Sequence, residues 1–236
     1  MMEEHSSSQY DIDLEMIRSK LWLMGGMVED QFHDAIYAYR DGNAVRAHQV
    51  VAKDEKVNSL ELSLDEDCAH VIVRRQPAAA DLRLVMAALK VVTDIERVGD
   101  EAVKIARIAA NTQERLVNDE LIRHSVMLMA RSAAKLFHDA RDAFARMEEA
   151  AAASILARDR EIDDEARSML RTMITYMMED PRSVAAALDA LWVSRAIERI
   201  GDHAKNIAEY VIYVVEGRDI RHTQYVYATL ASDKPA

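Results

Sequence analysis

The sequence is poor in the residues that interrupt helices, in aromatic side chains and in cysteine. Its 236 residues include six Gly and three Pro, and this scarcity predicts long, uninterrupted helices. Half of the residues are hydrophobic, which is enough to build a sizeable core. The single cysteine, Cys68, excludes an internal disulfide. A chain without disulfides fits a reducing compartment, so we expect a cytoplasmic protein.

Several functional classes lack their signals in this sequence. No apolar run approaches the ~18 to 20 residues that a membrane-spanning helix needs, and residues 1–8 lack the basic start and apolar core of a signal peptide. The net charge of −11 argues against nucleic acid as a partner. No P-loop, Rossmann glycine fingerprint or nucleophile elbow is present. We therefore expect a non-enzymatic protein that meets membranes only peripherally, through partner proteins.

What the sequence does contain is a long internal repeat. The segment Ile-Glu-Arg-Val-Gly-Asp-Glu at 95–101 returns as Ile-Glu-Arg-Ile-Gly-Asp-His at 197–203. The segment Phe-His-Asp-Ala at 32–35 returns in the same way at 137–140. A repeat of this length is a duplicated folding unit, because solenoid modules span only ~20 to 50 residues. The protein is therefore expected to consist of two similar halves.

Apolar residues recur at spacings of three and four along nearly the whole chain, which is the period of an α-helix. Pro77 suits the first turn of a third helix, and Asp180 followed by Pro181 predicts a capped start for a sixth. The alanines at 150–153 hide the turn before the fifth helix, which only the repeat places. We expect six long helices, over roughly 14–40, 43–75, 77–110, 120–146, 149–178 and 182–216.

The six helices predict an all-α fold of two tandem three-helix antiparallel bundles, with seams like those of coiled coils. The first bundle is expected over residues 11–112 and the second over 118–217. The polar residues at 111–119 link the halves, and residues 218–236 form a polar C-terminal tail. Bundles that pack along their lengths give one elongated body, whose side faces suit a homodimer.

Acidic side chains occupy seam positions where apolar residues are expected. Leu82, Leu89 and Glu96 are spaced by sevens and so lie on one stripe, and Asp100 lies one turn further along the same face. The second half repeats this pattern, and the preceding helix of each half adds two more oxygen-bearing side chains. The repeated motif of the second half contributes Glu198 and Asp202. The preceding helices contribute Asp159 and Asp163 in the second half, and Asp54 and Asn58 in the first.

These carboxylates need a positive charge or a proton nearby. Like charges one helical turn apart repel by roughly 0.2 to 0.5 kcal/mol, and burying unpaired carboxylates costs several kcal/mol each. Arg97 and Arg199 directly follow the glutamates, but a side chain at the next position points ~100° away, which weakens a salt-bridge interpretation. Four carboxylates facing each other across two helices form the hard-oxygen site that Mg, Mn, Ca or iron accepts. A solvated acidic face and a salt-bridge ladder remain the alternatives.

Gly99 and Gly201 lie between the Glu and the Asp of each motif. Gly inside a helix costs roughly 0.5 to 1 kcal/mol relative to Ala, so its presence in both copies predicts a close approach by a helix, a metal or a partner. A ferritin-like di-iron site is disfavoured, because the chain has no Glu-x-x-His. His33 and His138 are expected to be half-buried packing residues, and His203 is a candidate additional ligand.

The paired motifs at 95–101 and 197–203 resemble the signature of the PhoU family. The segments Arg-Gln-Pro-Ala-Ala-Ala-Asp-Leu-Arg at 75–83 and Asn-Ile-Ala-Glu at 206–209 carry the same resemblance, which covers residues 13–216. It implies two three-helix bundles and an accessory protein of phosphate-specific transport that restrains phosphate signalling when phosphate is plentiful. It also implies two partners, which are the ATPase subunit of the phosphate ABC transporter and the PAS region of a sensor histidine kinase.

The resemblance further implies metal clusters bound through Glu/Asp-x-x-x-Asp motifs, with Mg, Mn, Fe or Zn as candidate ions. Asn58 stands where the second half has Asp163, and a neutral amide oxygen weakens a cation site, so we expect the second half to bind metal more tightly. Carried over to this sequence, the implied metal ligands are Glu96, Asp100, Asp54, Glu198, Asp202, Asp159 and Asp163.

Two other functions use the same residues differently. A metal-dependent hydrolase or oxidase would need an open coordination position and a base beside these carboxylates. A metal-free helical adaptor would leave the acidic stripe solvated, and its stability would not change with divalent metal.

Overall fold

The structure, a computed structural model, describes residues 2–77, 79–111 and 120–221. Within these residues it contains six α-helices, one short 3-10 turn and no strand, which confirms the predicted all-α fold. The predicted linker residues 112–119 and tail residues 222–236 lie outside the described residues. The elements are α1 (Met2–Asp41), α2 (Ala44–Arg75), α3 (Ala80–Asn111), α4 (Glu120–Arg146), α5 (Glu149–Glu179), η1 (Pro181–Ser183) and α6 (Val184–Glu216).

Helix ends follow local capping chemistry. The side chain of Asn43 accepts a hydrogen bond from the Arg46 N–H at 3.0 Å and begins α2. Asp180 caps the start of η1, with Pro181 as the next residue, as predicted. Gly217 ends α6 in the left-handed conformation, with a φ of 73°.

Two predicted helix starts are wrong. The first helix begins at Met2 instead of near Leu14, because no Gly or Pro interrupts the chain before that point. The third begins at Ala80, so Pro77 lies in the turn before the helix. Gln76 and Ala79 both adopt positive φ values, of 48° and 47°, and the chain reverses there before α3 can start.

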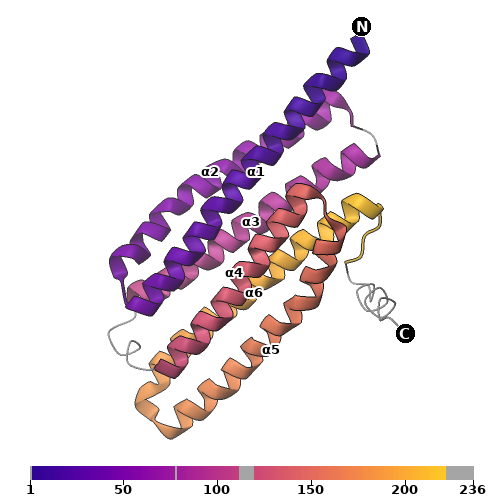
Figure 1. Cartoon of the computed structure of the whole chain (residues 1–236). Coiled ribbons are helices and arrows are strands. Elements are labelled where there is room, and N and C mark those ends of the chain that lie inside the picture. Colours follow the sequence, from indigo (N-terminus) through magenta and orange to yellow (C-terminus); the bar gives the residue numbers. More distant parts are fainter. Residues whose placement is uncertain (1, 78, 112–119, 222–236) are drawn as a thin grey trace, which may run out of the picture.

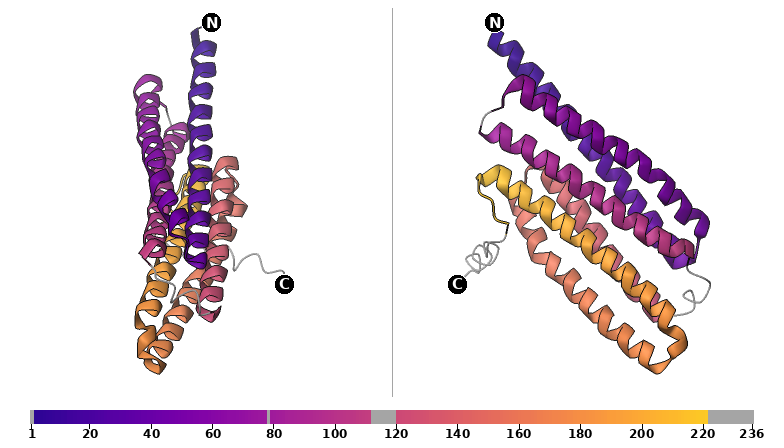
Figure 2. Two further views of the ribbon diagram at one scale, coloured as in Figure 1. Left: turned by 90° about the vertical axis from the view of Figure 1, so that its left-hand side faces the viewer. Right: turned by 180° about the vertical axis from the view of Figure 1, so that it is seen from behind.

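Each half of the chain forms one three-helix bundle, α1 to α3 and α4 to α6 (Figure 1). The bundles lie side by side along their lengths, so the molecule is elongated (Figure 2). Contacts between them are made by α3 with α6 and by α1 with α4, whereas α2 and α5 contact only their own bundle within the described residues. The helices α2 and α5 are therefore the outer helices. Among the described residues, no helix combines the length and the hydropathy that a membrane span requires.

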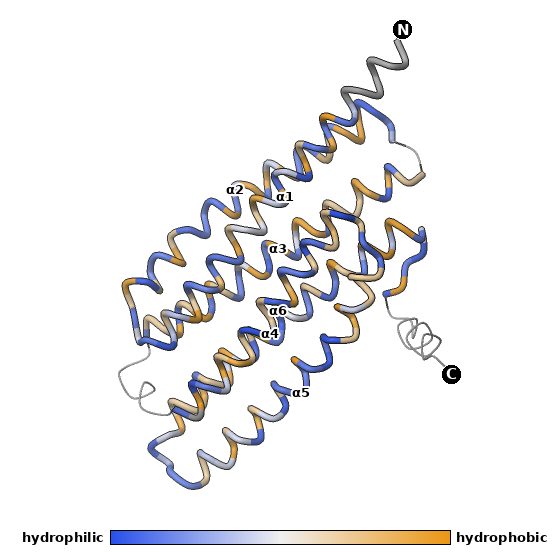
Figure 3. The backbone as a smooth tube through the Cα atoms, viewed as in Figure 1, coloured by the Kyte–Doolittle hydropathy of each residue, from blue (hydrophilic) through white to orange (hydrophobic). Residues whose placement is uncertain are grey.

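The core follows the amphipathic pattern of the helices. Apolar and polar residues alternate along each of them at the helical period (Figure 3). Phe32 and Phe137, which occupy matching positions of the repeat, are both among the largest fully buried side chains. Cys68 is buried with a free thiol, as expected of a small core residue. Burial of these apolar faces between helices is the main force that assembles each bundle.

Polar side chains also join the two bundles at buried positions. Asp94 of α3 accepts a hydrogen bond from Asn206 of α6 at 3.0 Å and lies 2.7 Å from Nδ1 of His203. Glu101 of α3 pairs with Arg199 of α6 at 3.2 Å. Because the earlier residue of α3 meets the later residues of α6, the two helices run antiparallel.

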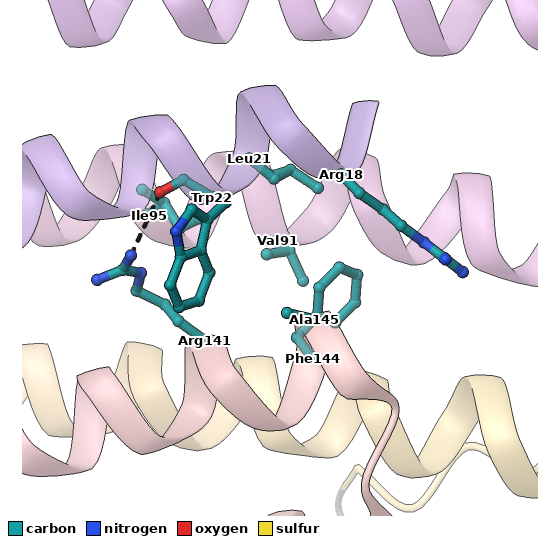
Figure 4. A pocket seen from close by; sticks show the side chains of 8 residues that line it. All are labelled: Arg18, Leu21, Trp22, Val91, Ile95, Arg141, Phe144 and Ala145. Carbon is teal, nitrogen blue, oxygen red and sulfur yellow. Dashed lines mark hydrogen bonds between the residues drawn. The ribbon is translucent and has the colours of Figure 1, made fainter. Parts of the chain in front are cut away.

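Arg141 of α4 makes the corresponding contact with α1 (Figure 4). Its guanidinium pairs with Glu29, donates to the backbone carbonyl of Trp22 at 3.2 Å and lies 4.7 Å from the centre of the Trp22 ring. Burial lowers the pKa of Arg141, and the Glu29 carboxylate opposes that shift. Arg141 and Trp22 line a small cavity between the bundles together with Val91 and Phe144, and its volume is about 30 Å³. This buried cation holds the two bundles together at a second place.

Candidate metal centre

Three carboxylates of the second bundle come together between α5 and α6. Asp159 and Asp163 lie one turn apart on α5 and face Asp202 of α6, and one oxygen of each lies within 4.8 Å of the other two. Asp159 is buried, Asp163 half-buried and Asp202 exposed, so the cluster opens to solvent on one side. Among the residues that the structure describes, no other group of three His, Cys, Asp or Glu side chains meets at this spacing.

Gly201 allows α5 to approach α6 beside this cluster. A Cβ atom at Gly201 would lie 3.1 Å from Cδ1 of Ile162 and 3.7 Å from Oδ1 of Asp159. The close approach predicted at this glycine is therefore a helix contact next to a carboxylate. A larger side chain here would push α5 away from α6 and separate the acidic residues.

Two basic side chains neutralise part of the second site. Lys205 donates a hydrogen bond from Nζ to Asp159 at 2.9 Å. Both carboxylate oxygens of Glu198 accept from Nη1 of Arg195 at 2.6 Å. Glu198, a predicted ligand, therefore faces Arg195 and is not a member of the three-carboxylate group.

Burial and the remaining negative charge raise pKa values at this site. Burial is the largest cause of the raised pKa of Asp163, followed by the charges of Asp159 and Glu198. The pKa of Asp202 is raised first by burial and then by Asp159, Asp163 and Glu198. Lys205 opposes both shifts without cancelling them. Binding of a proton or a cation is therefore favoured at this site.

The first bundle places Asp54 of α2 near Asp100 of α3, without the same convergence of three carboxylates. Burial raises the pKa of Asp54, and the charge of Asp100 adds to the rise. The pKa of Glu96 is raised first by burial, then by Asp100 and by Glu61 of α2. The first site is thus acidic as predicted, but its side chains are spread more widely.

Arg97 contacts both acidic residues of its own motif, including the neighbouring Glu96, so the salt-bridge interpretation holds at this residue although the spacing had weakened it. Its Nε lies 3.6 Å from Glu96, and its Nη1 lies 3.4 Å from Asp100. The long side chain folds back over the helix surface, which overcomes the ~100° offset of its Cα–Cβ bond. Arg199, in contrast, pairs with Glu101 of the other bundle.

The histidines also differ from their predicted roles. His33 and His138 are exposed, not half-buried, and Nδ1 of His138 lies 3.1 Å from Glu29 across the contact of α1 with α4. His203 contacts Asp94 of α3 because this side of α6 faces the other bundle instead of α5. It is therefore turned away from the carboxylates of the second site.

The donors of the second site fit a hard divalent cation. Carboxylate oxygens from two packed helices, with one side open to water, are the ligands that Mg²⁺, Mn²⁺ and Ca²⁺ prefer. Lys205 already neutralises part of the negative charge that such an ion would need, through its ion pair with Asp159. A bound ion would therefore compete with the ammonium group for Asp159.

Sequence reasoning missed four residues at these sites: Gln31, whose amide hydrogen-bonds Asp54, Glu61, Arg195 and Lys205. Arg195 lies three residues before Glu198, a spacing at which helical side chains meet, so that pair carried a local signal. The positions of Gln31 and Lys205 depend on how neighbouring helices are registered, which a repeat in one sequence does not specify.

The fold and the site together define a class of protein with two fused three-helix bundles and a duplicated acidic motif. The PhoU domain family matches residues 21–109 and 126–211, one match in each bundle. The chain therefore belongs to the PhoU family.

Individual relatives agree over nearly the whole length. The chain is 44% identical to a phosphate-specific transport system accessory protein PhoU homolog of Pseudomonas putida, over 94% of this chain and 86% of that protein. It is 41% identical to the accessory protein PhoU of Escherichia coli K12, over 94% of this chain and 91% of the relative. The crystal structure of PhoU from Pseudomonas aeruginosa matches with a TM-score of 0.85 and 43% identity, over 89% of this chain and 100% of the other.

Proposed function

We propose that this chain is a non-enzymatic, cytoplasmic regulator of phosphate uptake and of phosphate-responsive two-component signalling. It acts as an adaptor between the ATPase subunit of the phosphate ABC transporter and the PAS region of the sensor histidine kinase. The observation that carries the proposal is identity above 40% over 94% of the chain to proteins named accessory proteins of phosphate-specific transport. An adaptor needs exposed docking surfaces, and the elongated double bundle offers them on both sides.

One such surface is a groove between α5 and α6. It has a volume of about 320 Å³ and an apolar floor that includes Leu170, Leu188 and Trp192. These three side chains are 47%, 45% and 65% exposed. Arg167 and Arg195 line the same groove and supply positive charge to a strongly acidic chain. This combination suits a partner segment that carries apolar and acidic side chains.

The acidic sites add a metal-dependent element to the same proposal. A metal held by Asp159, Asp163 and Asp202 would brace α5 against α6 and would compete with Arg195 for the nearby carboxylate of Glu198. The groove shares Arg195 and Glu198 with that site, so metal occupancy changes the charge that a partner meets. Asp54, Glu96 and Asp100 form the corresponding first site. The same elongated body is proposed to form a homodimer, which light scattering on the purified chain measures.

Binding to the two purified partners tests the adaptor. We expect the chain to capture both the transporter ATPase subunit and the kinase PAS region, and a Leu188→Ala/Trp192→Ala variant to lose at least tenfold in affinity for one of them. Leu62→Ala is the matched control, since Leu62 is also 66% exposed but lies on α2. Binding of neither partner by the wild type contradicts the adaptor proposal. If the double variant binds both partners as tightly as the wild type, only the role of the groove as a docking surface is rejected.

Elemental analysis of the untagged protein after dialysis tests the metal sites. We expect bound divalent or transition metal (Mg, Mn, Fe or Zn) in the wild type and less in Glu198→Ala/Asp202→Ala. Wild-type protein that holds no metal, even after loading with each of the four ions, contradicts the metal part of the proposal. The adaptor would then work through its helical surfaces alone.

A further inference from the structure

Gln31 of α1 carries a buried amide oxygen that has no hydrogen-bond partner among the described residues. The residue is 1% exposed, and within the part of the chain that the structure describes no group donates a hydrogen bond to Oε1. Buried amides are nearly always paired, because an unpaired one gives up its contacts with water and gains nothing in return. Such a group points to a species that is not part of the protein chain.

The amide lies at the acidic site of the first bundle. Oε1 of Gln31 and Oδ1 of Asp54 lie 3.5 Å and 3.6 Å from the position that a Cβ atom on Gly99 would occupy. Both oxygens therefore border the same small space above Gly99, where α1, α2 and α3 meet. A hydrogen bond from the Gln31 amide group opposes the rise in the pKa of Asp54, so Nε2 is directed at that carboxylate and Oε1 is the atom left without a partner.

The second bundle shows that folding does not require an amide at this position. Gln31 directly precedes Phe32, and the residue that directly precedes Phe137 in the repeat is Leu136. Leu136 is equally buried, at 1% exposure. An apolar side chain thus fills this place in one copy of the fold, and an amide fills it in the other.

The two sites also differ in their other charges. Asn58 stands in the first site where the second has Asp163. Val103, four residues after Gly99, is buried and apolar, whereas Lys205, four residues after Gly201, pairs with Asp159. The first site therefore lacks one carboxylate and the internal ammonium group, and has a neutral amide oxygen from a third helix.

We infer that Gln31 is a cation ligand of the first site, with Oε1 acting beside the carboxylates of Asp54 and Asp100. This inference rests on the metal sites of the proposed function and goes beyond them, because it brings α1 into the site. Neutral oxygens with few carboxylates and no nitrogen or sulfur donor suit hard ions such as Mg²⁺ and Mn²⁺. The first site is thus a chemically different cation site from the second, and Gln31 contributes to the difference together with Asn58 and Val103.

The test isolates each site in the full-length chain. Asp163→Asn/Asp202→Asn leaves the first site, and Asp54→Asn/Asp100→Asn leaves the second. Gln31→Leu, which copies Leu136, is added to both. With the first site alone, we expect Gln31→Leu to raise the Kd for Mg²⁺ and Mn²⁺ at least tenfold, measured by calorimetry. With the second site alone, we expect no change. We also expect the metal-free Gln31→Leu protein to melt at or above the parent temperature.

Other outcomes overturn the inference in distinguishable ways. If Gln31→Leu changes the Kd by less than twofold, Gln31 is not a ligand, and the proposal of two metal sites is unaffected. A parent that binds neither ion at the isolated first site overturns that site and the role of Gln31 together, and the isolated second site then decides whether the proposed metal function survives. If Gln31→Leu does not fold, Gln31→Glu decides, since a carboxylate at the same place should lower the Kd for Mn²⁺. An unchanged Kd in Gln31→Glu also rejects the ligand role.

Discussion

Single residues decide how the negative charge of each site is balanced. In the second site Asp159 is held by Lys205, and Glu198 by Arg195, in separate pairs. Asp163 lies beside these pairs with a raised pKa, caused first by burial and then by the charge of Asp159. A carboxylate that binds its proton more tightly in the folded state destabilises that state when it is ionised. The site therefore lowers the stability of the metal-free fold.

Replacing Asp163 by Asn, the residue at the matching place in the first half, removes that charge. We expect Asp163→Asn to raise the stability of the metal-free protein by roughly 0.2 to 1 kcal/mol, a modest gain because Asp163 is partly exposed to screening water. The same variant should bind Mn²⁺ at least tenfold more weakly at the second site. Denaturant unfolding with a chelator present measures the first effect, and calorimetry measures the second. Asp164→Asn, on the exposed side of α5, is the control and should change neither.

Gly25 leaves room for the guanidinium group of Arg141 between the two bundles. A Cβ atom on Gly25 would overlap Nε of Arg141 and lie 2.9 Å from its Cδ, whereas one on Gly26 would be 3.7 Å from the nearest atom, Nη2. We expect Gly25→Ala to cost about 1 to 3 kcal/mol through overpacking, and Gly26→Ala to be neutral or to gain up to ~1 kcal/mol of helix propensity. Urea unfolding of the two variants measures the difference. Equal effects would mean that Arg141 is not fixed at this place.

At the scale of elements, helix boundaries were predictable where Gly, Pro and capping residues mark them. The ends of α2, α4 and α6 and the turn before α5 lie where the spacing and the repeat placed them. The start of α3 was not predictable, because Gln76 and Ala79 adopt positive φ values that neither residue type favours. The acidic motifs were predictable from seam spacing, whereas the contacts of Gln31 and Lys205 depend on helix register, which only the folded chain contains.

The C-terminal end of α2 carries conformational strain that a substitution relieves. Gln76 is exposed and holds a φ of 48° while its N–H donates to the Ile72 carbonyl. Gly adopts this conformation freely, so we expect Gln76→Gly to raise the free energy of unfolding by roughly 0.5 to 1 kcal/mol. Gly217→Ala is the reciprocal control: it puts a Cβ at a φ of 73° and should lower stability by a similar amount. Chemical denaturation measures both, and loss of stability in Gln76→Gly would contradict the strain argument.

At the scale of the whole molecule, the two acidic sites change the stability of the fold with pH in the same direction. Asp54 and Glu96 in the first bundle, and Asp163 and Asp202 in the second, all have raised pKa values, and burial is the largest cause in each case. A carboxyl group whose folded pKa lies above its unfolded pKa destabilises the fold at pH values above the folded pKa. This penalty is relieved as the pH falls through the folded pKa, where the group takes up its proton.

The metal-free protein should therefore become more stable as the pH falls from neutrality toward the raised pKa values of these groups, the opposite of the usual acid response of paired carboxylates. We expect a modest rise in the melting temperature, because Asp163 is half-buried and Asp202 exposed, so that water screens part of their repulsion. Mn²⁺ binds the ionised carboxylates, so the stabilisation that it adds should be largest at neutral pH and shrink as the pH falls. Melting curves across this range, with chelator and with Mn²⁺, measure both trends. The Asp163→Asn/Asp202→Asn variant should show a smaller rise without metal, because two of the four groups are gone. A wild-type protein that, without metal, loses stability as soon as the pH falls below neutrality would show that the raised pKa values do not govern its pH response.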